Sequence, residues 1–323
     1  MSASYAAWLV ESVGAPWSLA LREQASGPPA AGEVVVETAY SALNFADGLM
    51  LEGKYQVRPP LPFVPGHEFA GTVVESAYER LPVGTQVAAQ VPHGAFGARV
   101  RLAGDRCVVV PRGLGLDLAA AVLVSYTTAY LAIHRKARVQ PGDMVLIHAA
   151  AGALGTAAAQ LSKAAGAHVL GVVSSEAKKA VARTAGCDEV FLSDADWAAA
   201  VRGTVGLRGL DAVLDSVGGE TTSRSLKLLG WGGALLVVGF SSGEIASIPV
   251  NRLLLKAQDI MGVYWSFEEN PLQTLKMQQD MLAMVARGQL APVIDSVWPA
   301  AQLEPALRNV MARVTSGKVL LQW

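Results

Sequence analysis

A turn rich in small residues follows a short apolar segment near the middle of the chain. Val145–His148 has the pattern of a buried strand, Ala149–Gly155 that of a tight turn, and a helix-length segment comes next. In this context Gly152 would let the backbone approach a pyrophosphate, and Gly155 would let the helix pack on the strand. The helix N-terminus would supply amides for the phosphates. This interpretation assigns the contacts to Ala151, Gly152, Ala153, Leu154 and Gly155.

The turn alone supports two interpretations. Ala150 replaces the first glycine of the usual dinucleotide fingerprint, and small residues also connect strands to helices where no nucleotide binds. The end of the next strand therefore matters, because NAD-binding proteins place a carboxylate there to bind the ribose.

The next apolar segment, Val169–Val173, is followed by Ser174, Ser175, Glu176, Lys178 and Lys179. Two hydroxyl groups and two lysines suit the 2′-phosphate of NADP, which needs donors and positive charge. Glu176 would favour NAD if its side chain turned inward. The same residues also suit the N-cap and the exposed first turn of a helix, and both roles are compatible. The pattern favours NADP over NAD.

The segments around these motifs alternate between apolar strands and helix-length stretches, as a doubly wound parallel sheet requires. The expected strands are Val145–His148, Val169–Val173, Glu189–Phe191, Ala212–Asp215, Ala234–Val238 and Asp259–Val263. The expected helices are Leu154–Ala165, Ala177–Ala185, Thr221–Leu229 and one from Pro271 to Arg287.

The part of the chain before Pro111 has a different sequence pattern. Alternating segments at Val34–Tyr40, Phe69–Glu75 and Phe96–Leu102 are separated by Gly/Pro clusters, which indicates a β-rich domain. A length of 323 residues favours two cores. The fold class is therefore α/β, with a β-rich domain and a Rossmann doubly wound parallel sheet.

Composition excludes several classes of function. A net charge of −1 with interspersed charges gives no field that would collect nucleic acid or an anionic membrane. The N-terminus lacks the basic and apolar regions of a signal peptide. The Ala-rich segment from Met144 to Ala167 contains His148, Gln160 and Lys163, which are unfavourable in a membrane-spanning helix. We expect a cytoplasmic protein. Cys107 and Cys187 are too few for a thiolate zinc site or a disulfide framework, and we expect them to be buried and reduced.

Several motifs together resemble the zinc-independent quinone oxidoreductase branch of the medium-chain dehydrogenase/reductase superfamily, the zeta-crystallin-like enzymes. The resemblance covers essentially the whole chain, and the region from Gly239 to Trp265 is similar to the subgroup called quinone oxidoreductase-like. The motifs are Ala42–Asp47, Pro62–Gly71, Ser125–Tyr130, Ala149–Gly155, Asp215–Gly219, Val238–Phe240 and Gly317–Leu321.

The resemblance implies a GroES-like catalytic domain at 1–122 and 265–323, and a Rossmann NADP(H)-binding domain at 123–264. The active site would lie in a cleft between them. Members of the family form homodimers through the edge strand, here at about 259–263, which would cover an exposed sheet edge.

The segment Gly66–Glu68 also occurs in zinc alcohol dehydrogenases of this superfamily, where the histidine binds catalytic zinc beside two cysteines. Asn44 and Val124 stand at the positions of those cysteines. Neither can supply a thiolate, and catalytic zinc needs at least three protein ligands. We therefore expect no metal, and a hydrogen-bonded, wall-forming role for His67. Loss of the metal also removes the usual mechanism of alcohol oxidation.

The resemblance also implies residues around the reacting groups. Asn44, Asp47 and Tyr55 match positions that face the cleft, and Thr128 matches a position beside the nicotinamide. Tyr55 corresponds to the proton-donating tyrosine of enoyl thioester reductases, and a loop aromatic packed on the domain is the alternative. Asn44 would be a positioning donor. Asp47 would serve as a helix cap in preference to a catalytic group.

Further residues match cofactor positions in the family. Lys178 and Arg313 match basic residues near the 2′-phosphate, and Ser193 replaces the tyrosine that accompanies them. Gly239, Phe240 and Ser241 follow the fifth Rossmann strand, where the nicotinamide ribose would bind. Tyr264 and Trp265 would line the substrate side, or belong to the core or a dimer contact. Val217 and Lys318, in two of the motifs above, complete the predicted cofactor-binding set.

A metal-free reductase requires an acceptor that is already electron-poor. The sequence therefore predicts NADPH-dependent reduction of quinones or related carbonyl compounds. The alternative is reduction of enones or enoyl thioesters, with Tyr55 as the proton donor. A third possibility is a protein that binds NADPH without turnover.

Overall fold

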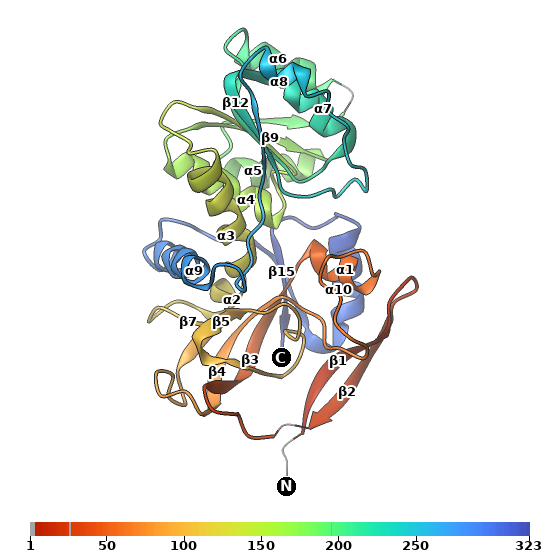
Figure 1. Ribbon diagram of the computed structural model, residues 1–323, viewed down its shortest axis with the longest axis vertical. Helices are drawn as coiled ribbons and strands as arrows, with labels where there is room; N and C mark the ends of the chain where they lie inside the picture. Colours follow the sequence, from red (N-terminus) through yellow and green to blue (C-terminus); the bar gives the residue numbers. More distant parts are fainter. Residues whose placement is uncertain (1–3, 26, 195) are drawn as a thin grey trace. The chain divides into compact units, whose positions relative to one another are not determined.

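The computed structural model describes residues 4–25, 27–194 and 196–323. The chain divides into two compact units. The terminal unit comprises Met1–Val124, Pro271–Gly288 and Ile294–Trp323, and the central unit comprises Ser125–Asn270 and Gln289–Val293. The central unit thus extends past residue 264, where the sequence-based boundary lies. Figure 1 labels some of the elements of each unit.

The central unit is built on a six-stranded sheet with the order β10-β9-β8-β11-β12-β13, and all of its pairings are parallel. This is the doubly wound order in which the first strand, β8, lies in the middle. Its strands are β8 (Met144–His148), β9 (His168–Val173), β10 (Glu189–Leu192), β11 (Leu210–Asp215), β12 (Leu229–Val237) and β13 (Asp259–Gly262). The prediction of a doubly wound parallel sheet is therefore confirmed.

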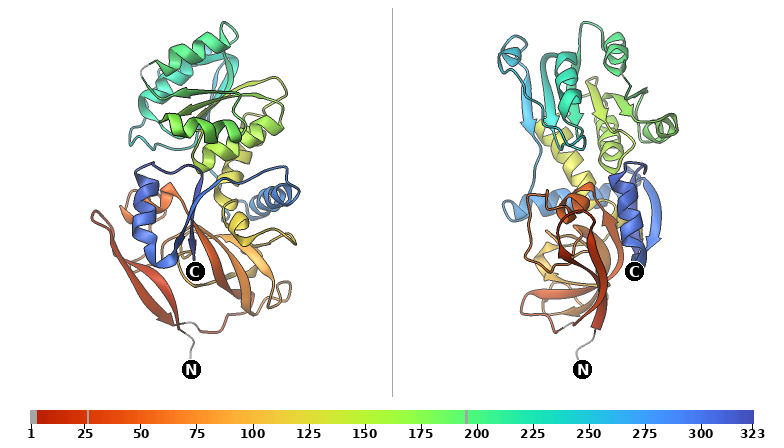
Figure 2. Two further views of the ribbon diagram at one scale, coloured as in Figure 1. Left: turned by 180° about the vertical axis from the view of Figure 1, so that it is seen from behind. Right: turned by 90° about the vertical axis from the view of Figure 1, so that its right-hand side faces the viewer.

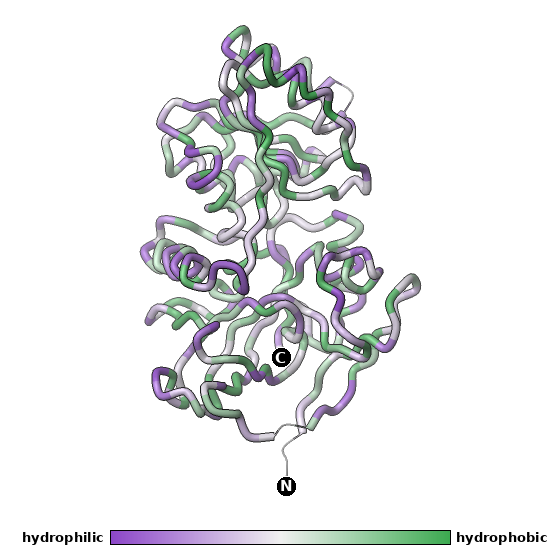
Figure 3. Tube along the Cα trace, in the orientation of Figure 1, coloured by the Kyte–Doolittle hydropathy of each residue, from purple (hydrophilic) through white to green (hydrophobic). Residues whose placement is uncertain are grey.

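Helices cover both faces of this sheet (Figure 2). They are α4 (Ala153–Ala164), α5 (Glu176–Thr184), α6 (Trp197–Val205), α7 (Gly219–Leu228) and the short α8 (Asn251–Leu254). The central strands are mainly green in Figure 3, because strands buried on both faces are continuously apolar. Helix α6 was not predicted. The chain enters the central unit through α3 (Leu123–Tyr130), and a π-helix (Leu131–Lys136) follows.

The terminal unit is β-rich, as predicted. Seven strands form its main sheet, with β14-β15-β3-β4-β5-β7 in order and β6 also paired to β3. The sequence-based strand at 96–102 is only partly correct, since β6 begins at Arg99 and Phe96 instead donates its backbone N–H to Pro65. The strands are β3 (Glu33–Leu43), β4 (Glu68–Ser76), β5 (Gln86–Gln90), β6 (Arg99–Ala103), β7 (Cys107–Val109), β14 (Ile294–Pro299) and β15 (Lys318–Gln322).

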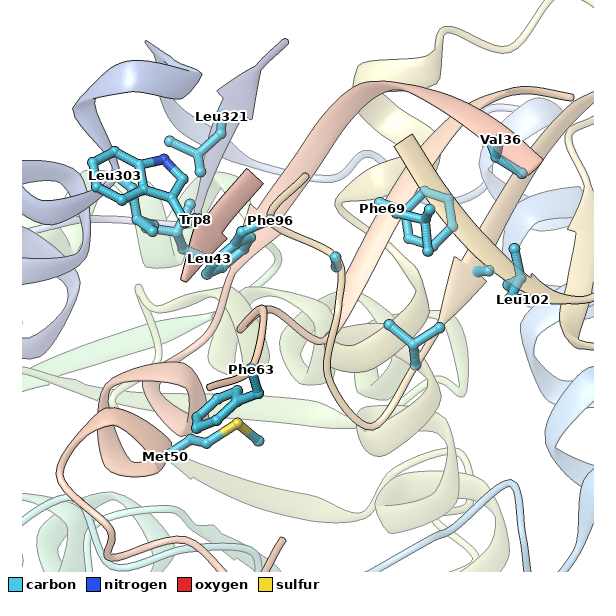
Figure 4. Close-up of a cluster of buried hydrophobic side chains, with 14 of the residues drawn as sticks. Trp8, Val36, Leu43, Met50, Phe63, Phe69, Phe96, Leu102, Leu303 and Leu321 are labelled. Carbon is cyan, nitrogen blue, oxygen red and sulfur yellow. The ribbon is translucent and has the colours of Figure 1, made fainter. Parts of the chain in front are cut away.

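Both ends of the chain contribute to this unit. β1 (Ser4–Ser12) and β2 (Ser18–Ala25) form a separate antiparallel pair, and β15 pairs with β3. The helices are α1 (Phe45–Leu51), α2 (Leu116–Ala120), α9 (Pro271–Ala286) and α10 (Leu303–Met311). Side chains from early and late segments share one core, in which Trp8, Phe63 and Phe96 lie with Leu303 and Leu321 (Figure 4).

Candidate functional site

The turn after β8 brings backbone atoms unusually close together. A Cβ at Gly155 would lie 2.3 Å from the Ala149 carbonyl oxygen and 2.7 Å from Ala150 Cα. Only glycine therefore lets α4 start directly against the turn. Gly152 is the N-cap of α4, so the first amides of this helix lie at the carboxyl edge of the sheet. Such amides bind anionic groups.

The structure accounts for Ala150, which departs from the dinucleotide fingerprint. Ala150 is fully buried, and its Cβ would lie 2.9 Å from a Cβ built on Gly171 of β9. Because Gly171 has no side chain, it leaves room for the methyl group of Ala150. A glycine is therefore not needed at position 150. Ala149 adopts a positive φ of 51°, a conformation that costs a non-glycine residue free energy.

Residues that were predicted to lie around the 2′-phosphate of NADP are found near the end of β9. Ser174 and Ser175 are exposed, and Ser175 is the N-cap of α5. Ser193 donates its backbone N–H to Val173, so it lies beside the same corner. The Glu176 carboxylate is 2.8 Å from Lys179 Nζ, and this pairing offsets the negative charge that would favour NAD. Lys178 is half-buried on the same helix.

Asp215 organises the loop that follows β11. Its carboxylate is buried and accepts hydrogen bonds from the backbone N–H groups of Val217 and Gly218 and from the Thr222 hydroxyl, at 2.8, 3.0 and 2.5 Å. Gly218 has a φ of +85°. Sequence analysis did not assign this role to Asp215, although a carboxylate directly after a buried strand was a usable signal.

The loop after β12 is joined to the Asp215 loop. Ser241 donates its backbone N–H to Ser216, and Ser242 donates its backbone N–H and its hydroxyl to Val217. The predicted residues Val217, Gly239, Phe240 and Ser241 are thereby brought to adjacent loops at the carboxyl edge of the sheet. Sequence analysis missed Ser242. Phe240 is 43% exposed.

The last strand of the sheet leads to two predicted aromatic residues with different environments. The Trp265 indole N–H donates to the Thr128 hydroxyl at 2.9 Å, which joins two predicted site residues of the central unit. Tyr264 is 63% exposed.

His148 lies at the end of β8 and is fully buried. Its Nε2 is 2.7 Å from the Ser225 hydroxyl, and its ring makes an edge contact with Trp197. Burial lowers the pKa of His148 to about 4, against a smaller opposing effect of Asp215. The imidazole is therefore neutral at pH 7 and has a packing role between β8, α6 and α7.

The terminal unit contains a buried charge cluster around Glu68. The Glu68 carboxylate forms an ion pair with Lys318 and accepts hydrogen bonds from Asn44 Nδ2 at 3.0 Å and from the Val124 backbone N–H at 2.8 Å. Lys318 also donates to Asn44 Oδ1 at 2.7 Å. Glu68 and Lys318 are 0% and 2% exposed. Both ends of the Asn44 amide are therefore engaged within the protein.

A second buried pair lies next to this cluster. Asp47 Oδ1 is 2.5 Å from His67 Nδ1, and Asp47 Oδ2 accepts the backbone N–H of Asn44 at 2.6 Å. Asp47 thus closes the first turn of α1, as the capping interpretation anticipated. The ring of Tyr55 contacts that of His67 edge-on, with centroids 5.3 Å apart.

Comparison with known proteins explains the combination of these two units. Residues 30–116 match the alcohol dehydrogenase GroES-like domain, and residues 153–286 match the family described as zinc-binding dehydrogenase. Quinone oxidoreductase-like protein 2 of Rattus norvegicus is 35% identical over 94% of this chain and 88% of its own length. The chain belongs to the quinone oxidoreductase branch of the medium-chain dehydrogenase/reductase superfamily. The terminal unit contains its GroES-like domain, and the central unit is its Rossmann domain.

Solved structures from the same branch agree over almost the whole chain. The quinone oxidoreductase of Thermus thermophilus, also determined as a complex with NADPH, has 34% identity and a TM-score of 0.87, covering 98% of this chain and all of that one. The Escherichia coli quinone oxidoreductase complexed with NADPH has 27% identity and a TM-score of 0.89, with coverage of 98% and 100%.

The name of the matching family raises the question of zinc, and the residues of this quinone oxidoreductase family member do not fit that metal. Asn44 and Val124 stand at the two positions where zinc ligands were predicted to be missing. The Asn44 amide is hydrogen-bonded to Glu68 and Lys318, and Val124 offers only its backbone. The Lys318 ammonium already neutralises the Glu68 carboxylate. Within the described ranges there is no group of three or more His, Cys, Asp or Glu side chains that could hold a metal ion.

Two predicted cofactor residues belong to the terminal unit. Lys318 is buried in the Glu68 ion pair, which is a structural role that the motif did not reveal. Arg313 is exposed and has a φ of +59° just after α10. Their contact with a cofactor stays a prediction.

The two cysteines are free, as expected. Cys187 is buried, but Cys107 is only half-buried, which corrects the expectation for that residue. Burial raises the pKa of each thiol to about 12, so neither is a reactive thiolate. The described part of the chain also has no helix long and apolar enough to cross a membrane.

Proposed function

We propose that this protein is an NADPH-dependent oxidoreductase that transfers hydride to quinones or other electron-poor carbonyl compounds without a metal ion. The observation that carries the proposal is the turn at 149–155, where Gly155 lets the α4 amides face the carboxyl edge of the sheet. The NADPH complexes of the Thermus and Escherichia relatives support the choice of cofactor.

The chain offers a separate group of residues for each part of NADPH. The amides at the start of α4 would bind the pyrophosphate, and Ser174, Ser175 and Lys178 would bind the 2′-phosphate. The two joined loops with Val217 and Ser241 would hold the nicotinamide ribose. When bound, the nicotinamide supplies a hydride. The protein's part is to orient the cofactor and to supply polar groups to the acceptor.

The direct test is NADPH oxidation with a panel of benzoquinones, naphthoquinones and enones, beside NADH as cofactor. We expect turnover of quinones with NADPH and much weaker turnover with NADH. Lys178→Ala should weaken NADPH binding by about 1–2 kcal/mol, as for one charge-assisted hydrogen bond, and leave NADH binding nearly unchanged. Equal losses for both cofactors would contradict the 2′-phosphate assignment.

Reduction of enones or enoyl thioesters is the alternative reaction. The observation in its favour is the position of Tyr55 beside the His67–Asp47 pair. Tyr55→Phe separates the two reactions, since enone turnover should collapse while quinone turnover largely survives. Equal survival of both would exclude the proton-donor role of Tyr55. Absence of NADPH oxidation with every acceptor would leave the third possibility, a protein that binds NADPH without turnover.

We also propose that the protein is a homodimer in the cytoplasm. Strand β13 is one of the two edge strands of the central sheet, with β12 as its neighbour. Trp231, Val250 and Leu254 are at least 76% exposed in the segments that flank it. A second copy would cover the edge and these side chains. Sedimentation equilibrium tests this expectation, and a species of 33.7 kDa at all concentrations would contradict it.

A further inference from the structure

The central unit has a pocket at the amino edge of its parallel sheet. Strands β12 and β13 begin at Leu229 and Asp259, so the segments just before them lie at that edge, opposite the carboxyl edge that carries the turn at 149–155. The pocket has a volume of about 380 Å³, within the range of about 300–1,000 Å³ that is typical of small-molecule sites. Its lining comes from the end of α7, from α8 and from the segment that leads to β13, and consists of Leu226, Lys227, Arg252, Leu255, Lys256 and Gln258.

Three of the lining side chains are cations. Lys227, Arg252 and Lys256 are exposed, and no carboxylate in the described part of the chain forms an ion pair with any of them. Asp259, which follows the last lining residue, is not part of the lining. Like charges around one hollow repel one another. An anion in the pocket would relieve that repulsion.

Hydrogen bonds hold one of these cations in place. The Leu229 carbonyl oxygen accepts hydrogen bonds from Lys256 Nζ at 3.0 Å and from Gln258 Nε2 at 3.1 Å. The Lys256 carbonyl oxygen accepts the Gly232 backbone N–H at 2.8 Å. Both the backbone and the ammonium of Lys256 are therefore fixed, and the ammonium has two further N–H groups for a ligand. Fixed side chains reduce the entropic cost of binding.

Two leucines give the pocket an apolar part. Leu226 is 4% exposed and belongs to the core of the central unit, whereas Leu255 is 74% exposed. An apolar ligand body against Leu255 would remove that side chain from water, which is favourable. Trp231, Val250 and Leu254, which the proposed dimer contact would cover, do not line the pocket.

We propose that this pocket binds a small amphiphilic anion, namely a carboxylate or a phosphate monoester on a short apolar chain. Lys227, Arg252 and Lys256 would hold the anionic head, because ammonium and guanidinium groups form charge-assisted hydrogen bonds with both kinds of oxyanion. Leu255 would contact the apolar chain. An inorganic anion would leave this leucine in water, and a neutral apolar molecule would leave the three cations without a counter-charge. The site is separate from the carboxyl edge of the sheet and does not depend on the proposed reductase function.

Isothermal titration calorimetry of the full chain tests the ligand class. The probes are decanoate, decyl phosphate, decanol and inorganic phosphate, each below the concentration at which it forms micelles. We expect one saturable site for decanoate or decyl phosphate, with an affinity that falls as salt is raised. The tighter of the two identifies the head group. Decanol and inorganic phosphate should bind at least about 10-fold more weakly, since each satisfies only one part of the pocket.

A double substitution tests the place of binding. Lys227→Gln with Arg252→Gln should weaken binding of the tighter amphiphile by about 10-fold or more, because charge-assisted hydrogen bonds are lost. Arg135→Gln with Lys136→Gln is the matched control, since it also removes one exposed arginine and one exposed lysine of the central unit that do not line the pocket. The control should leave the affinity unchanged. Thermal unfolding checks the fold, and Arg252→Gln alone takes the place of the pocket variant if the double variant does not fold.

Four results would overturn the proposal. They are the absence of saturable binding by either amphiphile, equally tight binding of decanol, equal loss of affinity in the two double variants, and displacement of the amphiphile by NADPH, which would assign it to the dinucleotide site. Sedimentation equilibrium adds one further outcome. A wild-type dimer that binds neither amphiphile and that the pocket variant dissociates would assign the pocket to a second copy of the chain and would likewise overturn the proposal.

Discussion

The buried polar groups of the terminal unit and the polar loops of the central unit are satisfied in different ways. Around Glu68, side chains of opposite charge neutralise one another in the interior. Around the turn at 149–155, backbone amides and glycines determine the geometry, and the side chains are small. A buried ion pair destabilises the protein when one partner is removed, whereas a site built from backbone atoms is disrupted when an added side chain fills the space around it. The two regions should therefore respond to different kinds of substitution.

The largest effect is expected from removal of the buried ammonium. Lys318→Met leaves the Glu68 carboxylate without its counter-charge and should lower the free energy of unfolding by about 3–5 kcal/mol, measured by urea denaturation. Lys276→Met removes an exposed ion pair with Asp280 and should cost less than about 1 kcal/mol. Equal effects of the two variants would mean that Glu68 is stabilised without Lys318.

The central unit has its own buried titratable group in His148. Because its pKa is lowered to about 4 in the folded state, the unfolded state binds a proton first as pH falls below about 6.5. The neutral His148 side chain therefore contributes about 3 kcal/mol to the free energy of unfolding above pH 6.5. This contribution is lost as the pH falls from about 6.5 to about 4.

Urea denaturation across this pH range tests the assignment. His148→Gln should flatten the acid slope relative to wild type. An identical slope for H148Q and wild type would show that another group causes the acid sensitivity.

A steric change at the turn should have an intermediate effect. Gly155→Ala places a Cβ 2.3 Å from the Ala149 oxygen and should cost about 1–3 kcal/mol in stability, and it should weaken NADPH binding by displacing the α4 amides. Gly203→Ala, in α6, meets no atom within 4 Å and should leave both properties intact. Thermal unfolding and fluorescence titration with NADPH measure them. Unchanged NADPH affinity in G155A would argue against the turn as the phosphate site.

The smallest effect is expected at Ala149. Its φ of +51° is costly for alanine, so Ala149→Gly should raise the free energy of unfolding by about 1 kcal/mol. Ala150→Gly should instead lower it, because the Ala150 methyl fills space beside Gly171. Comparison of the two unfolding temperatures tests this, and a gain in A150G would refute the packing argument.

The sequence alone determined the central unit well. Strand, turn and helix follow one another there along the chain, so the parallel sheet, the Gly155 turn and the serines after β9 could all be located from local patterns. What it missed is also local: Asp215 and Ser242 lie within or beside predicted motifs, but their hydrogen bonds join two loops that follow different strands.

The terminal unit depended on tertiary structure. The residue types pointed to a cap at Asp47, and the resemblance to the superfamily pointed to the loss of two zinc ligands. The pairing of Glu68 with Lys318 joins β4 to β15, and no spacing along the chain predicts it. The same holds for His67, whose unpaired Nε2 becomes visible, among the residues that the structure describes, only when β4, α1 and the Tyr55 loop are placed together. Local geometry is encoded by neighbouring residues, whereas the partners of a buried charge are selected by packing of distant segments.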